Sequence, residues 1–302
     1  MSHPPTLKQL KYLCAVADKQ HFGQAASACF VSQSTLSAGI SELEQTLGVT
    51  LIDRSKKHVS LTAIGRDVTE RAKAVLTDID DLVATAVAAH EPFSTEMRLG
   101  VIPTIAPFLL PKILKTFRQR YPRFKLYIRE DLSGNLLEEL HAGQLDLLLL
   151  ALPYPAEGVT QRHLFYDELL LATSKGDKLG KRKRLLTSDL KQSELLLLEE
   201  GHCLRDHVLD ACKLKDRDIK VPYQATSLNT VIQMVANDIG VSILPRMAVD
   251  ANILRGTSVE AHAFADREVQ RSIGLMWRSR SPRQEEFTQV GELICECMGL
   301  AG

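Results

Sequence analysis

The stretch FGQAASACFVSQSTLSAGISELEQTLG, residues 22–48, decides the fold of the first part of the chain. Its first third is rich in alanine, which lets another helix cross closely, and VSQ then predicts a turn with Ser32 as a helix N-cap. The apolar residues that follow recur at helical spacing, at Leu36, Ile40, Leu43 and Leu47. Gly48 suits the end of this second helix. The stretch therefore predicts a helix-turn-helix, whose second helix enters the major groove of DNA.

Polar side chains cover the outer face of the second helix near its start, at Gln33, Ser34, Thr35 and Ser37. Small donors and acceptors at this place can meet phosphates and base edges. The next segment, LIDRSKKHVSLT, alternates apolar and polar residues around a basic tip, which is typical of a hairpin wing. Its cations are candidates for phosphate contacts, at Arg54, Lys56 and Lys57. A three-helix bundle with a solvated polar face is the alternative.

The composition indicates the class of protein. The chain has 302 residues, enough for about two domains, and its 37 basic and 37 acidic residues give a net charge of zero. A hydrophobic content of 45% is typical of a globular protein. Neither a secretory signal nor a run of about 18 apolar residues is visible. We therefore expect a cytoplasmic protein, in which structural disulfides are rare, and DNA binding has to be argued from pattern.

A long helix with a narrow apolar stripe is predicted after the wing. Its apolar residues step by three and four positions from Ile64 to Ala86, which suits pairing with a second helix. The segment HEPFSTE, residues 90–96, then breaks the helix at Pro92 and predicts a hinge. We favour a dimer, which would match a two-fold symmetric DNA site, over a helix packed on its own domain.

The C-terminal two-thirds of the chain alternate strands with helices, beginning at MRLGVI. This alternation predicts βαβ units and a parallel sheet. In such α/β folds, ligands bind at the carboxyl ends of strands. Thr104 follows the first strand and Ser133 follows the second, so their hydroxyls are candidate ligand contacts. Each of them taken alone would fit a plain helix N-cap.

Two of the six cysteines, Cys203 and Cys212, lie in the segment GHCLRDHVLDAC. His202 and Arg205 flank Cys203 at the start of a predicted helix, where a cation and free N–H groups favour a thiolate. An ordinary buried cysteine is the alternative. The spacing fits neither a zinc site nor a thioredoxin-like catalyst, so we expect no metal. The remaining cysteines are interpreted as structural, at Cys14, Cys29, Cys295 and Cys297.

The geometry of a helix limits what the two cysteines can do together. If the segment is helical, their Cα atoms lie about 13–14 Å apart. A disulfide needs Cα atoms within about 7 Å, so the pair could be joined only if the segment melted and repacked. A bond formed in this way would act as a switch.

The segment FGQAASACFVSQSTLSAGISELEQTLGVTLIDR with LTAIG resembles the winged helix-turn-helix of LysR-type transcriptional regulators. The resemblance implies an α/β protein with a winged helix-turn-helix at residues 1–62, a linker and dimerisation helix at 63–90 and a hinge at 91–96. A regulatory domain at 97–302 would adopt the two-lobed fold of periplasmic binding proteins. Lobe one would span about 97–166 and 268–302, and lobe two about 167–267. A homodimer or tetramer, a double-stranded DNA operator and RNA polymerase are the implied partners, without a cofactor.

The segment LEEGHCLRDHVLDAC is similar to the redox segment of the peroxide-sensing branch of that family, as are GVIPTIAPFLLP, ATSLNTVIQMV and RSIGLMWR. The resemblance implies that Cys203 attacks hydrogen peroxide and becomes a sulfenic acid, with which Cys212 condenses. The residues implied to form the peroxide pocket are Thr104, Ser133, His202, Arg205, Asp206 and Arg271. Relatives often carry threonine where Ser133 stands. A regulator of this family that responds to a small organic anion is the main alternative, and a thiol peroxidase is a third.

Overall fold

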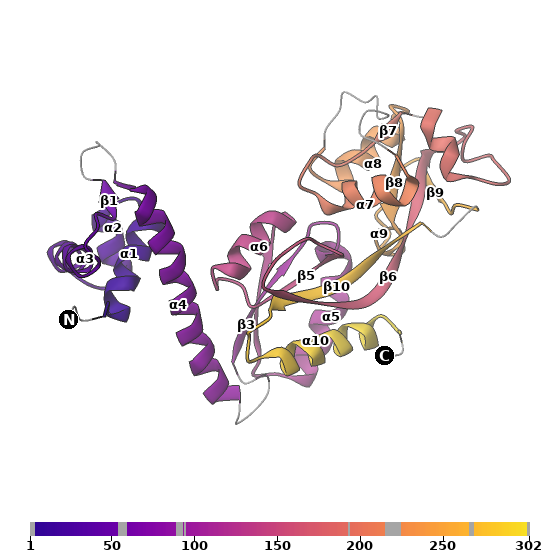
Figure 1. Cartoon of the computed structure of the whole chain (residues 1–302). Coiled ribbons are helices and arrows are strands. Elements are labelled where there is room, and N and C mark those ends of the chain that lie inside the picture. The colour runs from indigo at the N-terminus through magenta and orange to yellow at the C-terminus, as the bar shows by residue number, and fades with distance from the viewer. Residues whose placement is uncertain are drawn as a thin grey trace. The chain divides into compact units, whose positions relative to one another are not determined.

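The computed structural model describes residues 4–53, 59–88, 93, 95–192, 194–214, 225–265 and 269–300. The chain folds as two compact units, residues 1–87 and residues 88–140 with 144–302 (Figure 1). Most of the predicted hinge lies outside the described residues, and the finer domain boundaries remain predictions.

The first unit begins with three helices, α1 (Leu7–Lys19), α2 (Phe22–Ala28) and α3 (Gln33–Leu47). The predicted turn is confirmed, because the Ser32 side chain caps α3 by accepting from the Thr35 N–H, and Gly48 ends α3 with a φ of 69°. Most of the predicted apolar face is buried, at Leu36, Ile40 and Leu43. Leu47 is an exception, since it is 37% exposed at the last position of the helix.

The predicted wing is an antiparallel pair of short strands, β1 (Ile52–Asp53) and β2 (Ser60–Leu61). Its basic tip lies outside the described residues, and with it the predicted contacts of Arg54, Lys56 and Lys57. The helix α4 (Ala63–Ala88) follows. Ile64, Val75 and Leu82 are exposed along it, and the pairing of α4 with a second helix remains a prediction.

The second unit starts with the predicted βαβ units. Its elements are β3 (Glu96–Val101), α5 (Ala106–Arg120), β4 (Lys125–Glu130), α6 (Ser133–His141) and β5 (Leu147–Leu152). The strand β3 pairs in parallel with both β4 and β5. The carboxyl ends of β3 and β4 therefore lie side by side, which brings the segments that follow them to one edge of the sheet.

Two long strands, β6 (Val159–Ser174) and β10 (Gln270–Arg278), join the lobes of this unit (Figure 1). The sheet order is β4-β3-β5-β10-β6-β8-β7, with β9 paired to β6. The first part of β6 pairs with β10 up to Glu168, and from Leu169 on it pairs with β8 and β9. The chain therefore crosses to a second lobe along β6 and returns along β10, as the two-lobed fold requires.

The other elements divide between the two lobes. Lobe two contains η1 (Thr187–Gln192), β7 (Leu195–Leu196), α7 (Cys203–Cys212), α8 (Leu228–Ala236), β8 (Val241–Pro245), α9 (Arg246–Asp250) and β9 (Val259–His262). The helix α10 (Gln284–Cys297) packs against lobe one. Each lobe has its own apolar core: the lobe-one core contains Leu99, Leu149 and Phe287, and the lobe-two core contains Leu171 and Val231. Among the described residues, no helix is long and apolar enough to cross a membrane.

Candidate redox site

The site begins at the first residue of α7. Gly201 has a φ of 94°, a conformation that side chains rarely adopt, and it turns the chain into the helix. His202 is the N-cap residue, but its side chain makes no capping hydrogen bond. Cys203 is therefore the first helical residue, as predicted, beside backbone N–H groups that favour an anion. Its side chain is buried, with only 5% exposed.

Cys203 lines a narrow hollow that, in this conformation, leaves essentially no free volume for a water-sized molecule. The hollow is lined by three segments: the one after β3, the start of α6 and the turn before α7. Its lining residues are Ile102, Pro103, Thr104, Leu132, Ser133, Gly201, His202 and Cys203. The parallel pairing of β3 and β4 positions Thr104 and Ser133 together, since each follows one of these strands. Three of the predicted pocket residues, Thr104, Ser133 and His202, therefore lie around one space with Cys203.

The hydroxyls of Thr104 and Ser133 do not cap helices. The N-cap of α5 is Ile105, and Thr104 Oγ1 instead accepts a hydrogen bond of 2.8 Å from Arg271 Nη1. The Ser133 hydroxyl is buried and makes no hydrogen bond of good geometry among the described atoms, although it lies close enough to the Cys203 thiol to lower its pKa. The interpretation of either residue as a plain cap is therefore wrong. A buried hydroxyl without a partner costs free energy, so Ser133 is suited to bind a polar ligand in the hollow.

Arg271 is buried and holds the Thr104 segment in place. Its Nη2 donates to the Thr104 carbonyl at 2.9 Å, and its guanidinium pairs with Asp167 at 3.0 Å. The other carboxylate oxygen of Asp167 accepts from the Met247 N–H at 3.0 Å. A buried cation is tolerated when it is paired in this way. Sequence reasoning missed Asp167, because nothing in the sequence links residues 167 and 271 before the pairing of β6 with β10 is known.

The surroundings of Cys203 favour its thiolate. Burial raises the pKa of the Cys203 thiol, but His207, Arg271 and Ser133 together lower it by more than burial raises it. The pKa therefore lies below its ordinary value. A thiolate is the form of cysteine that attacks electrophiles. Sequence reasoning also missed His207. Its signal was the spacing of four residues from Cys203, which places both side chains on one face of a helix.

The environments of the predicted pocket residues at the start of α7 differ from one another. His202 is buried, and burial lowers its pKa, so its imidazole is neutral at pH 7. Arg205 lines a separate hollow in lobe two and donates to the Leu198 carbonyl at 3.3 Å. Asp206 is exposed. Arg205 and Asp206 are not among the lining residues of the Cys203 hollow, and their roles remain predictions.

Cys212 lies at the opposite end of α7 in a different environment. It is 3% exposed and belongs to the lobe-two core, whereas Cys203 belongs to the lobe-one core. No disulfide joins them in the structure. The whole segment between them is helical, so their Cα atoms are about 13–14 Å apart.

Three other cysteines, Cys14, Cys29 and Cys295, are poorly suited to react. Burial raises the pKa of Cys14 to about 11 and also raises the pKa values of Cys29 and Cys295. These thiols stay protonated at pH 7 and are poor nucleophiles. Among the described residues, no group of three or more histidine, cysteine or acidic side chains is arranged to hold a metal ion.

The predicted DNA-binding side chains lie at the start of α3. Gln33, Ser34 and Thr35 are exposed, and Ser37 is half-buried. Ser34 and Thr35 each contact the Ser32 hydroxyl, at 2.9 and 2.8 Å. Their contacts with DNA remain predictions.

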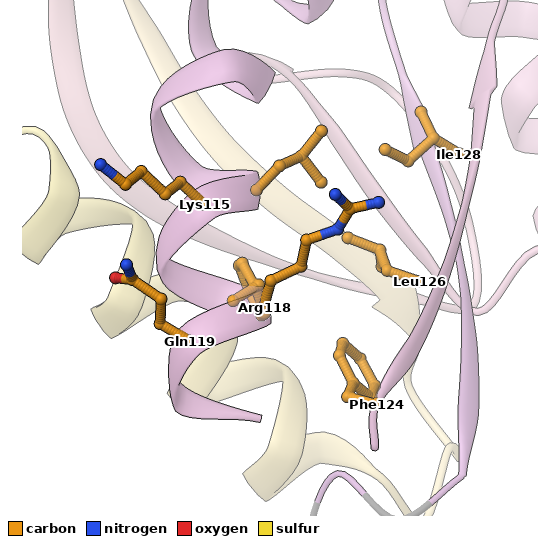
Figure 2. Close-up of a pocket in the computed structure, with 8 residues that line it drawn as sticks. Lys115, Arg118, Gln119, Phe124, Leu126 and Ile128 are labelled. Atoms are coloured by element: carbon orange, nitrogen blue, oxygen red, sulfur yellow. The ribbon is translucent and has the colours of Figure 1, made fainter. Parts of the chain in front are cut away.

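A wider groove lies on lobe one between α5 and β4, with about 1220 Å³ of space that is partly open to solvent (Figure 2). Arg118 extends across it between the apolar side chains of β4, Leu126 and Ile128. The lining residues include Lys115, Arg118 and Gln119 but no cysteine, histidine or carboxylate. The groove therefore offers cationic, amide and apolar side chains but no thiol, imidazole or carboxylate.

Comparison with known proteins identifies the family. Residues 7–66 match the model of the bacterial regulatory helix-turn-helix proteins of the lysR family, and residues 90–296 match the LysR substrate binding domain. The chain belongs to the LysR family of transcriptional regulators.

Within this family, the similar proteins include a probable hydrogen peroxide-inducible genes activator of Streptomyces viridosporus, 40% identical over 97% of this chain and 95% of that protein. The transcriptional regulator EstR of Acinetobacter baylyi is 37% identical over 97% of both chains. A full-length OxyR variant from Pseudomonas aeruginosa has a similar structure, with a TM-score of 0.80 and 32% identity over 98% of this chain and 96% of that one.

Proposed function

We propose that this chain is a hydrogen peroxide-sensing transcriptional regulator of antioxidant genes, and that a reversible Cys203–Cys212 disulfide switches it. The observation that carries the proposal is the environment of Cys203. This buried thiol has a lowered pKa and faces a small hollow with the unpartnered Ser133 hydroxyl, while Cys212 lies in another core. The similarity to a hydrogen peroxide-inducible activator supports the same function.

The first chemical step is attack of the Cys203 thiolate on one oxygen of hydrogen peroxide. The S–O bond forms as the O–O bond breaks, and the sulfur is oxidised to a sulfenic acid. The departing hydroxide takes up a proton and leaves as water. In this scheme, the Thr104 and Ser133 hydroxyls and the His202 imidazole hold the peroxide, and Arg271 stabilises the developing negative charge.

The second step is condensation of the Cys203 sulfenic acid with the Cys212 thiol, which forms the disulfide and releases a second water. Because a disulfide brings Cα atoms within about 7 Å, α7 must unwind. Cys212 must also leave the lobe-two core, in which it packs with Leu209 and other apolar residues. Rebuilding of lobe two is the event that the rest of the regulator detects.

The first unit delivers the response to DNA. We infer that Gln33, Ser34, Thr35 and Ser37 contact an operator, that the wing contacts phosphates, and that α4 pairs with a second copy through its exposed apolar side chains. Oxidation then changes the spacing of the two DNA-binding units in a dimer or tetramer. Recruitment of RNA polymerase in the cytoplasm completes the proposal.

The proposal is tested by DNase footprinting of the full chain on its operator, before and after peroxide at low micromolar concentration. We expect peroxide to shift the footprint of the wild-type protein and to leave that of Cys203→Ser unchanged. Cys14→Ser is the matched control, because it removes a buried thiol whose pKa is about 11, and its footprint should shift like the wild type. A wild-type footprint that does not change with peroxide would contradict the proposal. It would favour a regulator that responds to a small organic effector.

A further inference from the structure

His207 lies next to Cys203 and has no role in the two oxidation steps described above. It lies one helical turn after Cys203 in α7, half-buried between the two lobes. Its Nδ1 is 2.6 Å from the carbonyl oxygen of Cys203, and its Nε2 is 3.2 Å from the carbonyl oxygen of Leu152 at the end of β5. Both ring nitrogens therefore face hydrogen-bond acceptors.

This geometry determines the protonation of the ring. A carbonyl oxygen can only accept, so each nitrogen must carry a hydrogen to form a hydrogen bond. A neutral imidazole carries only one N–H, whereas an imidazolium carries two. The two carbonyls thus select the charged form of His207, although a buried cation also needs a nearby anion.

The anion that can balance this charge is the Cys203 thiolate. Burial lowers the pKa of His207, but Cys203 and the Leu152 carbonyl raise it by more than burial lowers it. The pKa of His207 therefore lies above its ordinary value. Other charged or titratable groups also lie near the pair. Arg271 on β10 is paired with Asp167, and His202 directly precedes Cys203 and has a lowered pKa. Asp206 is exposed, and burial, Cys203 and Asp206 raise the pKa of Tyr154. Arg271 already has a carboxylate partner and Asp206 is exposed to solvent, so the Cys203 thiolate is the buried anion that can balance His207.

We infer that His207 is a positioning residue of the sensor: a doubly protonated imidazolium, clamped between the carbonyls of Cys203 and Leu152, that balances the Cys203 thiolate and ties α7 to lobe one. The inference rests on the proposed function only in taking Cys203 as the thiol that reacts.

Oxidation of Cys203 removes the negative charge that the His207 imidazolium balances. The thiolate becomes a sulfenic acid, and the hydroxide that leaves the peroxide needs one proton to form water. His207 no longer faces an anion and gives up one proton, so the reaction closes without a net proton from solvent. A neutral His207 can donate to only one of its two carbonyls, so one of the two hydrogen bonds is lost. One of the two contacts that hold His207 in place is therefore lost just when α7 has to unwind.

The test is the pH profile of alkylation of Cys203 by iodoacetamide in the reduced full chain. Trypsin cleaves after Arg205, so Cys203 and Cys212 fall on different peptides and mass spectrometry follows each one separately. We expect His207→Gln to move the midpoint of the Cys203 profile upward by about 1–3 pH units, the usual effect of losing an adjacent opposite charge. His207→Lys restores a cation and should recover part of the shift.

The matched control is His262→Gln, which removes another half-buried histidine of lobe two, one that contacts Thr173 at 3.3 Å rather than a cysteine. Its Cys203 profile should coincide with that of the wild type. A His207→Gln profile that also coincides with the wild type, in a protein with an unchanged melting temperature, overturns the inference.

A second measurement decides the question even if His207→Gln does not fold. Coupling between two titrating groups is reciprocal, so Cys203→Ser must lower the pKa of His207 by a similar amount. Nitrogen NMR of the His207 ring should report an imidazolium in the reduced wild-type protein at pH 7, and a neutral ring in Cys203→Ser and after peroxide. A neutral ring in the reduced wild-type protein would overturn the inference.

Failure of this inference is distinguishable from failure of the proposed function. If His207→Gln leaves the alkylation profile unchanged while peroxide still forms the disulfide, only the role of His207 is lost. If the profile shifts as expected but peroxide leaves Cys203 unmodified, the charge pair stands and the peroxide sensor does not.

Discussion

The two ends of α7 hold the same kind of side chain in opposite surroundings. At the start of the helix, Cys203 lies among groups that stabilise negative charge, next to a hollow with an unpartnered hydroxyl. At its end, Cys212 packs into the apolar core of lobe two. This difference indicates that Cys203 is placed to react, whereas Cys212 stays buried until the helix unwinds.

The largest expected effect comes from the buried ion pair behind the reactive end. Arg271→Met leaves the Asp167 carboxylate buried without its cation, which should lower the free energy of unfolding by about 3–5 kcal/mol. Arg246→Met removes an arginine that pairs with Glu168 at 2.6 Å, with side chains 44% and 34% exposed. This surface pair should be worth at most about 1 kcal/mol. Urea denaturation of both variants measures the contrast, and equal losses would contradict it.

The next effect concerns the buried end. Leu209→Ala removes apolar volume beside Cys212 in the lobe-two core and should lower the free energy of unfolding by about 2 kcal/mol. The weakened packing should speed closure of the disulfide and leave formation of the sulfenic acid unchanged. Dimedone trapping follows the first step and non-reducing peptide mapping follows the second. A change in the first step would mean that the two ends are not independent.

A smaller effect is expected at the hollow itself. Ser133→Ala removes the unpartnered hydroxyl and should slow oxidation of Cys203 about tenfold, the loss of one hydrogen bond to a developing charge. Ser133→Thr keeps a hydroxyl and should oxidise at nearly the wild-type rate. Both rates are measured by dimedone trapping in a Cys212→Ser background, where the sulfenic acid cannot be resolved. Equal rates for the alanine and threonine variants would exclude a role for the hydroxyl.

The smallest effect is a difference in pH dependence between cysteines. Because the pKa of Cys203 is lowered, its thiolate fraction rises with pH and levels off at a lower pH than that of an ordinary cysteine, whose pKa is about 8.5. Above that pH its oxidation rate should be flat. Cys14, with a pKa of about 11, should still gain reactivity there. Peroxide oxidation rates across this range check the contrast, and a Cys203 rate that keeps rising would place its pKa at or above the ordinary value.

The sequence predicts the elements of this protein better than its charge network. Helical spacing and caps located α3 between Ser32 and Gly48, and the alternation of strands and helices predicted the parallel pairing of β3 with β4. That pairing placed Thr104 and Ser133 at one edge of the sheet, and the helix geometry separated Cys203 from Cys212. These features follow from local periodicity, which a sequence displays directly.

The missed residues depend on contacts between distant segments. Asp167 becomes visible only when β6 pairs with β10 and brings it to Arg271. The protonation of His207 depends on the Leu152 carbonyl at the end of β5, which no spacing within α7 reveals. The assignment of the two cysteines to different cores likewise needs the packing of both lobes. Tertiary contacts decide these features, and local patterns carry no trace of them.

Hydrogen exchange across α7, combined with non-reducing peptide mapping after one equivalent of peroxide, tests the central claim most directly. We predict that the peptides of Cys203 and Cys212 become linked and that the amides between them lose protection together, because the helix cannot persist with its two ends joined. The claim is contradicted if the link does not form, or if it forms while the amides of α7 exchange as slowly as in the reduced protein.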